Sequence, residues 1–244
     1  MPASHPTPSG FLALRKAFGL QRVNIGAWVT AQEQAQIAPQ FHQAFTDLQT
    51  ILGVPKAVIS LRGTLSVRYG AGGRPGVSAH YEPDARTLAL AKKAGPGSLA
   101  HEWFHALDHY LGRHTFLDPN PYAFASSLWL SEHQAKHHPL INALFACFQA
   151  IMLSPDGHSP SPLVAASVAA DRARGTLYYS RPEELCARAF EAFVEDHSIR
   201  NPFLVSGSHQ LLYPQGHQRL HIQQTFTTYF KALSQAVTSA SQSP

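Results

Sequence analysis

Residues 101–105 read His-Glu-Trp-Phe-His, and this pentad constrains the chain more than any other stretch. Histidines four positions apart lie on one face of an α-helix, so the pattern predicts a helix across this segment. A helix with a broad apolar face and a narrow polar stripe packs against a core and can enclose a polar site. The apolar residues of this stretch fall on the face opposite the histidines: Trp103, Ala106, Leu107, Tyr110 and Leu111.

The spacing of the two histidines is typical of a metal site. Two imidazoles at i and i+4 can bind one ion, and the Glu that follows the first His can reach a water on that ion. Zinc lowers the pKa of a bound water to about 7, and a nearby carboxylate can accept its proton as the water attacks a carbonyl. The sequence therefore predicts Zn²⁺ held by His101 and His105, with Glu102 as the general base.

A catalytic zinc needs a third protein ligand and one open position. The metzincin pattern is excluded, because it would place glycine at position 108 and histidine at position 111, where this chain has Asp108 and Leu111. Asp108 is expected either to orient a zinc-bound histidine or to cap the end of the helix. His109 lies well round the helix from His101, and we expect it on the surface.

A later helix, near residues 182–196, carries the candidates for the third ligand. Ser180 and Glu183 have the spacing of a capping box, which predicts a structural role for Glu183 at the helix start. Glu184 belongs to a polar stripe opposite the apolar positions of this helix. That stripe faces either water or the zinc helix, and its periodicity is the same in both cases. The other polar members of the stripe are Arg188, Glu191 and Glu195.

The pentad and the later motif Glu-x-x-Ala-x-Ala-Phe at 184–190 together resemble the gluzincin metallopeptidases, particularly the anthrax-lethal-factor-like group. The resemblance implies that Glu184 is the third zinc ligand. It also implies that a tyrosine just before the motif, Tyr178 or Tyr179, stabilises the tetrahedral intermediate. Longer stretches look like the bacterial CLCA_X family and the large polyvalent protein-associated domains of phage and mobile elements, which share the zincin motif. These stretches are 78–83, 88–92, 97–108 and 178–185.

The fold class expected is α+β, a zincin-like fold in which a small mixed sheet packs on the pentad helix and several further helices. Strand or coil is predicted for 11–29. Thr30 caps a helix, and Gly112 ends the pentad helix. The predicted strands are 58–61, 65–69, 78–81 and 87–91. The predicted helices are 31–52, 98–111, 140–153, 163–174, 182–196 and 220–237.

A single domain is predicted over 10–235, with 113–175 as an insertion or a lid and with disordered tails at 1–9 and 236–244. The strand 87–91 comes directly before the zinc helix. It is either the zincin edge strand that pairs with an extended peptide or an ordinary core strand.

Composition narrows the classes of function. The formal net charge is +4 and the basic residues are scattered, which gives no support for nucleic-acid binding. No apolar stretch approaches the roughly 20 residues needed to cross a bilayer, and the N-terminus lacks the features of a signal peptide. We therefore expect no membrane association and a cytoplasmic location. Cys147 and Cys186 are expected to be buried free thiols.

The function predicted is hydrolysis of peptide bonds in a peptide or protein substrate by a zinc-dependent metallopeptidase. One alternative is a zinc-binding but catalytically inactive module that engages a mobile-element or host protein. Another is a narrow protease that cleaves one cytoplasmic repressor or toxin. A groove blocked by 113–175 would favour the binding module, whereas an open groove with an ordered edge strand would favour the enzyme. No oligomeric state is predicted.

Overall fold

The computed structural model describes residues 10–71, 79–92, 97–208 and 210–242. Over these ranges the chain combines a four-stranded mixed sheet with helices, which confirms the α+β class. The strands are β1 (Val23–Ile25), β2 (Ser66–Tyr69), β3 (Ala79–Glu82) and β4 (Thr87–Leu90). The helices are α1 (Gly10–Phe18), α2 (Ala31–Leu52), α3 (Lys56–Ile59), α4 (Leu99–Thr115), α5 (Ala125–Leu130), α6 (Pro139–Met152), α7 (Pro162–Arg174), α8 (Pro182–Glu195) and α9 (Gly216–Gln242).

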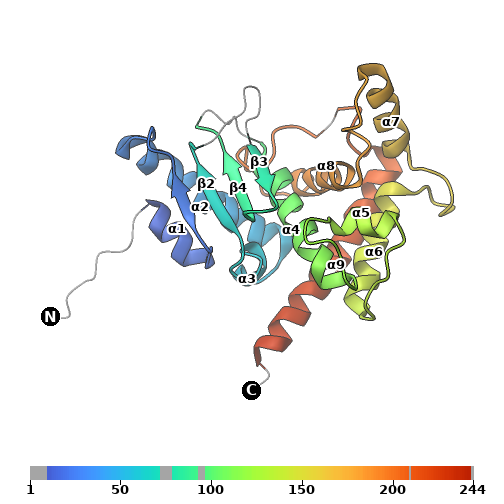
Figure 1. The fold of residues 1–244 in the computed structure, drawn as a ribbon, viewed down its shortest axis with the longest axis horizontal. Coiled ribbons are helices and arrows are strands. Elements are labelled where there is room, and N and C mark those ends of the chain that lie inside the picture. The colour runs from blue at the N-terminus through green and yellow to red at the C-terminus, as the bar shows by residue number, and fades with distance from the viewer. Residues whose placement is uncertain (1–9, 72–78, 93–96, 209, 243–244) are drawn as a thin grey trace.

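The sheet has the order β1-β2-β4-β3, with β3 antiparallel to β4 and the other neighbours parallel. Every residue of β4 is buried, whereas the residues of β3 are half-buried. Strand β4 is therefore central, and β3 is the edge strand nearest α4. Of the two expectations for 87–91, the core strand is confirmed and the edge strand is wrong. In Figure 1 helix α4 lies between this sheet and helices α5 to α8.

Helix α2 begins and ends where its sequence predicts. Thr30 and Glu33 form a reciprocal capping box at its start, and Gly53 ends it in the left-handed conformation. The Phe41 ring of α2 packs edge-on against Tyr69 of β2, with the centroids 5.9 Å apart. Helix α2 therefore packs against the sheet at β2.

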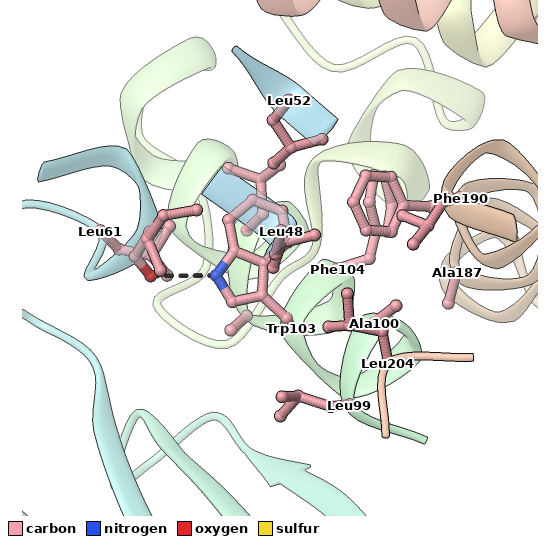
Figure 2. Close-up of a cluster of buried hydrophobic side chains, with 14 of the residues drawn as sticks. Leu48, Leu52, Leu61, Leu99, Ala100, Trp103, Phe104, Ala187, Phe190 and Leu204 are labelled. Carbon is pink, nitrogen blue, oxygen red and sulfur yellow. Dashed lines mark hydrogen bonds between the residues drawn. The ribbon is translucent and has the colours of Figure 1, made fainter. Parts of the chain in front are cut away.

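A second helical layer holds α4 in place. Figure 2 shows Trp103 and Phe104 of α4 in a buried cluster with Phe190 of α8. The ring centroids of Phe104 and Phe190 are 5.0 Å apart. The Trp103 indole donates a 2.9 Å hydrogen bond to the carbonyl of Ile59, which satisfies its polar atom inside the core. Because this apolar face points inward to the core, the polar face of α4 lies towards β3 and the start of α8.

Two expectations are wrong in part: the first half of 11–29, expected as strand or coil, is helix α1, while 23–25 form β1, and 58–61 were expected as a strand. Phe11, Leu14 and Phe18 are buried on one face of α1, so the spacing of three and four along this segment is a helical signal. Residues 58–61 form the end of α3 and the turn that follows, not a strand. Leu61 and Arg62 have positive φ there, as the chain reverses between α2 and β2.

Helix α4 continues past Gly112 to Thr115, so the expected stop at Gly112 is wrong. A Cβ at this position would lie 2.4 Å from the carbonyl oxygen of Ala123. Glycine is therefore required by the close approach of the chain before α5, and it does not end the helix. Helix α9 also runs further than expected, to Gln242. The tail predicted at 1–9 lies outside the described residues, as does Ser78.

The two cysteines, Cys147 and Cys186, are buried and free, as expected. Among the described residues, no helix is both long enough and apolar enough to cross a membrane.

Candidate metal centre

Three potential metal donors meet between α4 and the start of α8. His101 and His105 project from the polar face of α4, and Glu184 lies in the first turn of α8. One ligand atom from each residue lies within 4.8 Å of the other two. Within the described ranges, this is the one group of three or more His, Cys, Asp or Glu side chains that could hold a metal ion. Helix packing through Phe104 and Phe190 brings the two elements together.

The separations of these atoms fit one small ion. The two Nε2 atoms of His101 and His105 are 3.0 Å apart. The Glu184 carboxylate oxygens lie 3.3 Å from His101 Nε2 and 3.4 Å from His105 Nε2. Ligands at about 2.0–2.1 Å in a tetrahedron are separated by about 3.3 Å, which is close to these separations, although Glu184 approaches His101 through Oε2 and His105 through Oε1. The donor set, two imidazoles and a carboxylate, is one that zinc accepts.

The same groups perturb one another electrostatically in the absence of an ion. Burial alone would lower the pKa of His101, but its hydrogen bonds to Glu184 and Glu191 outweigh burial and raise the pKa to about 10. Burial would raise the pKa of Glu184, but the hydrogen bonds with both histidines lower it well below its usual range. The positive charge of protonated His101 therefore interacts with the same carboxylates that would interact with a bound cation.

Glu102 lies beside this cluster and lines the groove that opens from it. Burial raises the pKa of its carboxyl group, and the two neighbouring histidines oppose that shift. The backbone of Tyr81 in β3 donates a hydrogen bond to the carboxylate. A carboxylate with a raised pKa next to a metal site is suited to accept and release a proton.

The groove is open and has a volume of about 660 Å³. The edge strand β3 and the turn after it form one wall, over residues 79–85. Phe124, which precedes α5, also lines the groove, together with Tyr178, His105 and Glu184. The ring of Phe124 packs edge-on against His105, with the centroids 6.0 Å apart. An extended chain lying in this groove would run alongside an exposed strand edge.

Tyr178 and Tyr179 lie in different environments. Tyr178 lines the groove, and its hydroxyl hydrogen-bonds the Glu184 carboxylate. Burial and the charge of Glu184 raise the pKa of Tyr178, so the hydroxyl keeps its proton. The ring of Tyr179 instead lies against the guanidinium groups of Arg174 and Arg188. Of the two tyrosines, Tyr178 is the one that can donate to a reacting group in the groove.

One aspartate fixes the segment that carries Tyr178. Asp171, near the end of α7, accepts hydrogen bonds from the backbone amides of Tyr178, Tyr179 and Ser180 and from the Ser180 hydroxyl. Ser180 therefore does not cap α8, and the expected capping box with Glu183 is wrong. Glu183 instead lines the groove and accepts a 3.0 Å hydrogen bond from the Ser127 hydroxyl of α5.

The polar stripe of α8 faces the protein interior. Glu184, Arg188 and Glu191 are all buried. Arg188 donates to the carbonyls of Glu184, Tyr179 and Leu212. It therefore ties the Tyr178 segment and the segment before α9 to α8. The sequence left this orientation open, because a solvent-facing stripe has the same periodicity.

Asp108 and His109 have structural partners that the sequence did not indicate. Asp108 is buried and accepts hydrogen bonds from the amide and the hydroxyl of Ser126, so it anchors α5. It does not cap the end of α4 but binds a first-turn amide of α5, and within the described residues no hydrogen bond joins it to either histidine of the cluster. His109 is buried, not on the surface. Its ring hydrogen-bonds the Tyr81 hydroxyl and the carbonyl of Pro121.

Two residues beside the cluster were not singled out as a pair. Glu191 lies 2.9 Å from Nδ1 of His101, and the Tyr213 hydroxyl donates to the same Glu191 oxygen at 3.0 Å. Glu191 follows Glu184 by two helical turns, and the sequence placed both on one polar stripe without indicating that this stripe meets His101. Tyr213 lies in an irregular segment before α9, and nothing in its local sequence connects it with the histidines.

Residues 170–237 match the model of Large polyvalent protein-associated domain 1. The match covers less than half of the chain, and it supports the resemblance to the large polyvalent protein-associated domains. No curated protein and no solved structure matches the chain.

The segment that matches the large polyvalent protein-associated domain contributes one side of the metal centre. It contains Tyr178, Glu184, Glu191 and Tyr213, whereas the pentad at 101–105 lies outside it. The resemblance to gluzincins and to CLCA_X rests on the sequence motifs alone and stays a prediction.

Proposed function

We propose that this chain is a zinc-dependent metallopeptidase of the gluzincin type that hydrolyses peptide bonds. The observation that carries the proposal is the convergence of His101, His105 and Glu184 beside an open groove that is lined by His105, Glu184 and Glu102. The donor atoms of the three residues lie within 4.8 Å of one another, and the nearby Glu102 carboxylate has a raised pKa.

The proposed roles follow from position and protonation. A zinc ion at this site would polarise a substrate carbonyl and lower the pKa of a bound water. Glu102 accepts a proton from the attacking water and passes it to the leaving amine. Tyr178 keeps its proton and donates a hydrogen bond to the oxyanion of the tetrahedral intermediate. The exposed edge of β3 orients an extended peptide along the groove.

The open groove and the described edge strand favour an enzyme over a binding module. Phe124 of the 113–175 segment contributes to the groove wall and leaves the groove open. The enzyme and the binding module both require zinc, and only the enzyme hydrolyses a peptide bond.

The test compares Glu102→Gln with the wild type and with Glu184→Ala, using elemental analysis and peptide cleavage measured by mass spectrometry on a mixed peptide library. We expect Glu102→Gln to retain one zinc per chain and to lose at least about 100-fold in cleavage rate, because it cannot accept the proton. Glu184→Ala is expected to lose zinc. Full activity in Glu102→Gln would contradict the mechanism. Zinc binding without cleavage by the wild type would favour the binding module.

A further inference from the structure

Glu191 and Tyr213 form a short hydrogen-bonded relay behind His101. The Glu191 carboxylate lies 2.9 Å from His101 Nδ1, the nitrogen that points away from the donor cluster. Tyr213 donates to the same carboxylate oxygen, Oε2, at 3.0 Å. The side chains of His101 and Glu191 are 15% and 7% exposed, so water competes little for these bonds.

This contact assigns a proton to Nδ1 of the imidazole. A carboxylate accepts the Nδ1–H and cannot donate a proton, so Glu191 holds the proton on Nδ1 and leaves Nε2, which faces Glu184, as the nitrogen that binds an ion when the ion displaces a proton there. Nε2 is the atom that faces His105 and Glu184. The ring is thus held with Nε2 facing the other two donors and with Nδ1 occupied by Glu191.

The second histidine lacks such a partner. Nδ1 of His105 is buried and has no hydrogen-bond partner among the described residues. Asp108 lies one turn further along α4 but is held by Ser126. Glu191 is therefore the carboxylate that orients a histidine of this centre.

The charges are also balanced by this arrangement. Two carboxylates, Glu184 and Glu191, lie on opposite sides of the buried His101 ring. Their position on both sides of the ring reduces the cost of placing a cation there. Arg188 supports the relay from outside the cluster, because it donates to the carbonyl of Leu212, next to Tyr213.

We infer that Glu191, supported by Tyr213, is a positioning residue that holds His101 in the zinc-binding tautomer and strengthens zinc binding. The inference rests on the proposed function, since it concerns the same centre. It assigns a task to a residue that touches neither the ion nor the substrate.

The test is zinc affinity, measured with Zn²⁺ alone in competition with a chromophoric chelator. Glu191→Gln is expected to weaken zinc binding by about 10-fold or more, because Gln removes the charge and accepts a proton less strongly. Tyr213→Phe removes only one hydroxyl and is expected to weaken binding by a smaller factor. Glu195→Gln, which alters another α8 carboxylate away from the cluster, serves as the matched control and should bind zinc like the wild type.

A second measurement separates positioning from simple damage to the fold. Long-range ¹H–¹⁵N spectra of the zinc-loaded wild type are expected to show His101 with its proton on Nδ1 and its Nε2 bound to metal. Finding the proton on Nε2 would overturn the inference even if Glu191→Gln failed to fold.

The outcomes for the two proposals can be told apart. A wild type that binds zinc, with Glu191→Gln binding equally tightly, would overturn this inference alone. A wild type that binds no zinc would overturn the proposed function together with it.

Discussion

Tyr178 and Tyr179 are neighbours in sequence, yet only one of them reaches the groove. Asp171 accepts hydrogen bonds from three consecutive backbone amides at this point, and these bonds fix the backbone that carries both tyrosines. The Tyr178 hydroxyl therefore meets Glu184, whereas the Tyr179 ring packs between two guanidinium groups. At the scale of single residues, the backbone contact of an aspartate decides which tyrosine can take part in chemistry.

We expect Tyr178→Phe to lower kcat by about 100-fold with little change in KM, because one oxyanion donor is removed. Tyr179→Phe keeps the ring that the arginines contact and should stay within a few-fold of the wild type. Steady-state kinetics on a peptide found by library screening would measure both. Equal losses in the two variants would contradict the assignment of Tyr178.

Asp108 provides a residue-scale prediction on pH. Burial raises the pKa of its carboxyl group from 3.8 to about 6, although hydrogen bonds from Ser126 oppose the shift. Because the folded pKa is raised, ionisation costs stability as pH rises from about 4 to about 6, and the cost remains at neutral pH. Asp108→Asn cannot ionise, and its amide can still bond the Ser126 amide and hydroxyl.

The stability of Asp108→Asn relative to the wild type should therefore be greater at pH 7 than at pH 4, by a difference on the order of 3 kcal/mol. Urea unfolding of both proteins at the two pH values measures it. If the stability difference between the two proteins does not change with pH, ionisation of Asp108 does not lower the free energy of unfolding.

Helix α4 illustrates how an element is shaped by its neighbours. Its pentad and its apolar face are local properties, and both are read correctly from the sequence. Its C-terminal end is not, because Gly112 is a packing residue: the Ala123 carbonyl lies where a Cβ would be. The close approach brings the start of α5, and with it Phe124, against His105.

Gly112→Ala tests this reading of α4. In an open helix the change would stabilise by up to about 1 kcal/mol. Here we expect a loss of about 1–3 kcal/mol in the free energy of unfolding, because the methyl group would meet backbone that cannot easily move. Denaturant unfolding gives the sign, and a stabilised variant would contradict the packing argument.

The metal centre depends on the whole molecule, because its donors come from two helices far apart in sequence. His101 and His105 belong to α4, and Glu184 belongs to α8, inside the segment that matches the large polyvalent protein-associated domain. The apolar contacts among Trp103, Phe104 and Phe190 hold the helices together (Figure 2). An unfolded chain would not keep these donors within reach of one ion.

Zinc should therefore stabilise the folded protein. At a free zinc concentration 100 times Kd, we expect about 2.7 kcal/mol of added stability, seen as a rise in Tm that a chelator reverses. The rise should shrink as pH falls, because His101 binds a proton in competition with the ion. The variant His101→Ala is the control and should show no rise. An equal rise in that variant would mean that zinc binds elsewhere.

The sequence determined the features that depend on neighbouring residues. The capped helix α2 and the strands β2 and β4 follow from local patterns of polarity and turn residues. The pentad also placed both histidines on one helical face. These predictions succeed because helix and strand periods are set within a few residues.

Only the tertiary structure decided how these elements face one another. It made β3 the edge strand, buried the stripe of α8 that includes Glu184, and brought Glu191 and Tyr213 behind His101. Each depends on contacts between residues distant in sequence, and a solvent-facing pattern and a site-facing pattern of polar residues are identical along the chain. The sequence by itself thus determined the helix that carries His101 and His105 and the face that they share. Tertiary packing decided that Glu184 faces the histidines and that Glu191 and Tyr213 lie behind His101. The physical reason is that contacts between distant elements fix which polar face of one helix lies against another helix.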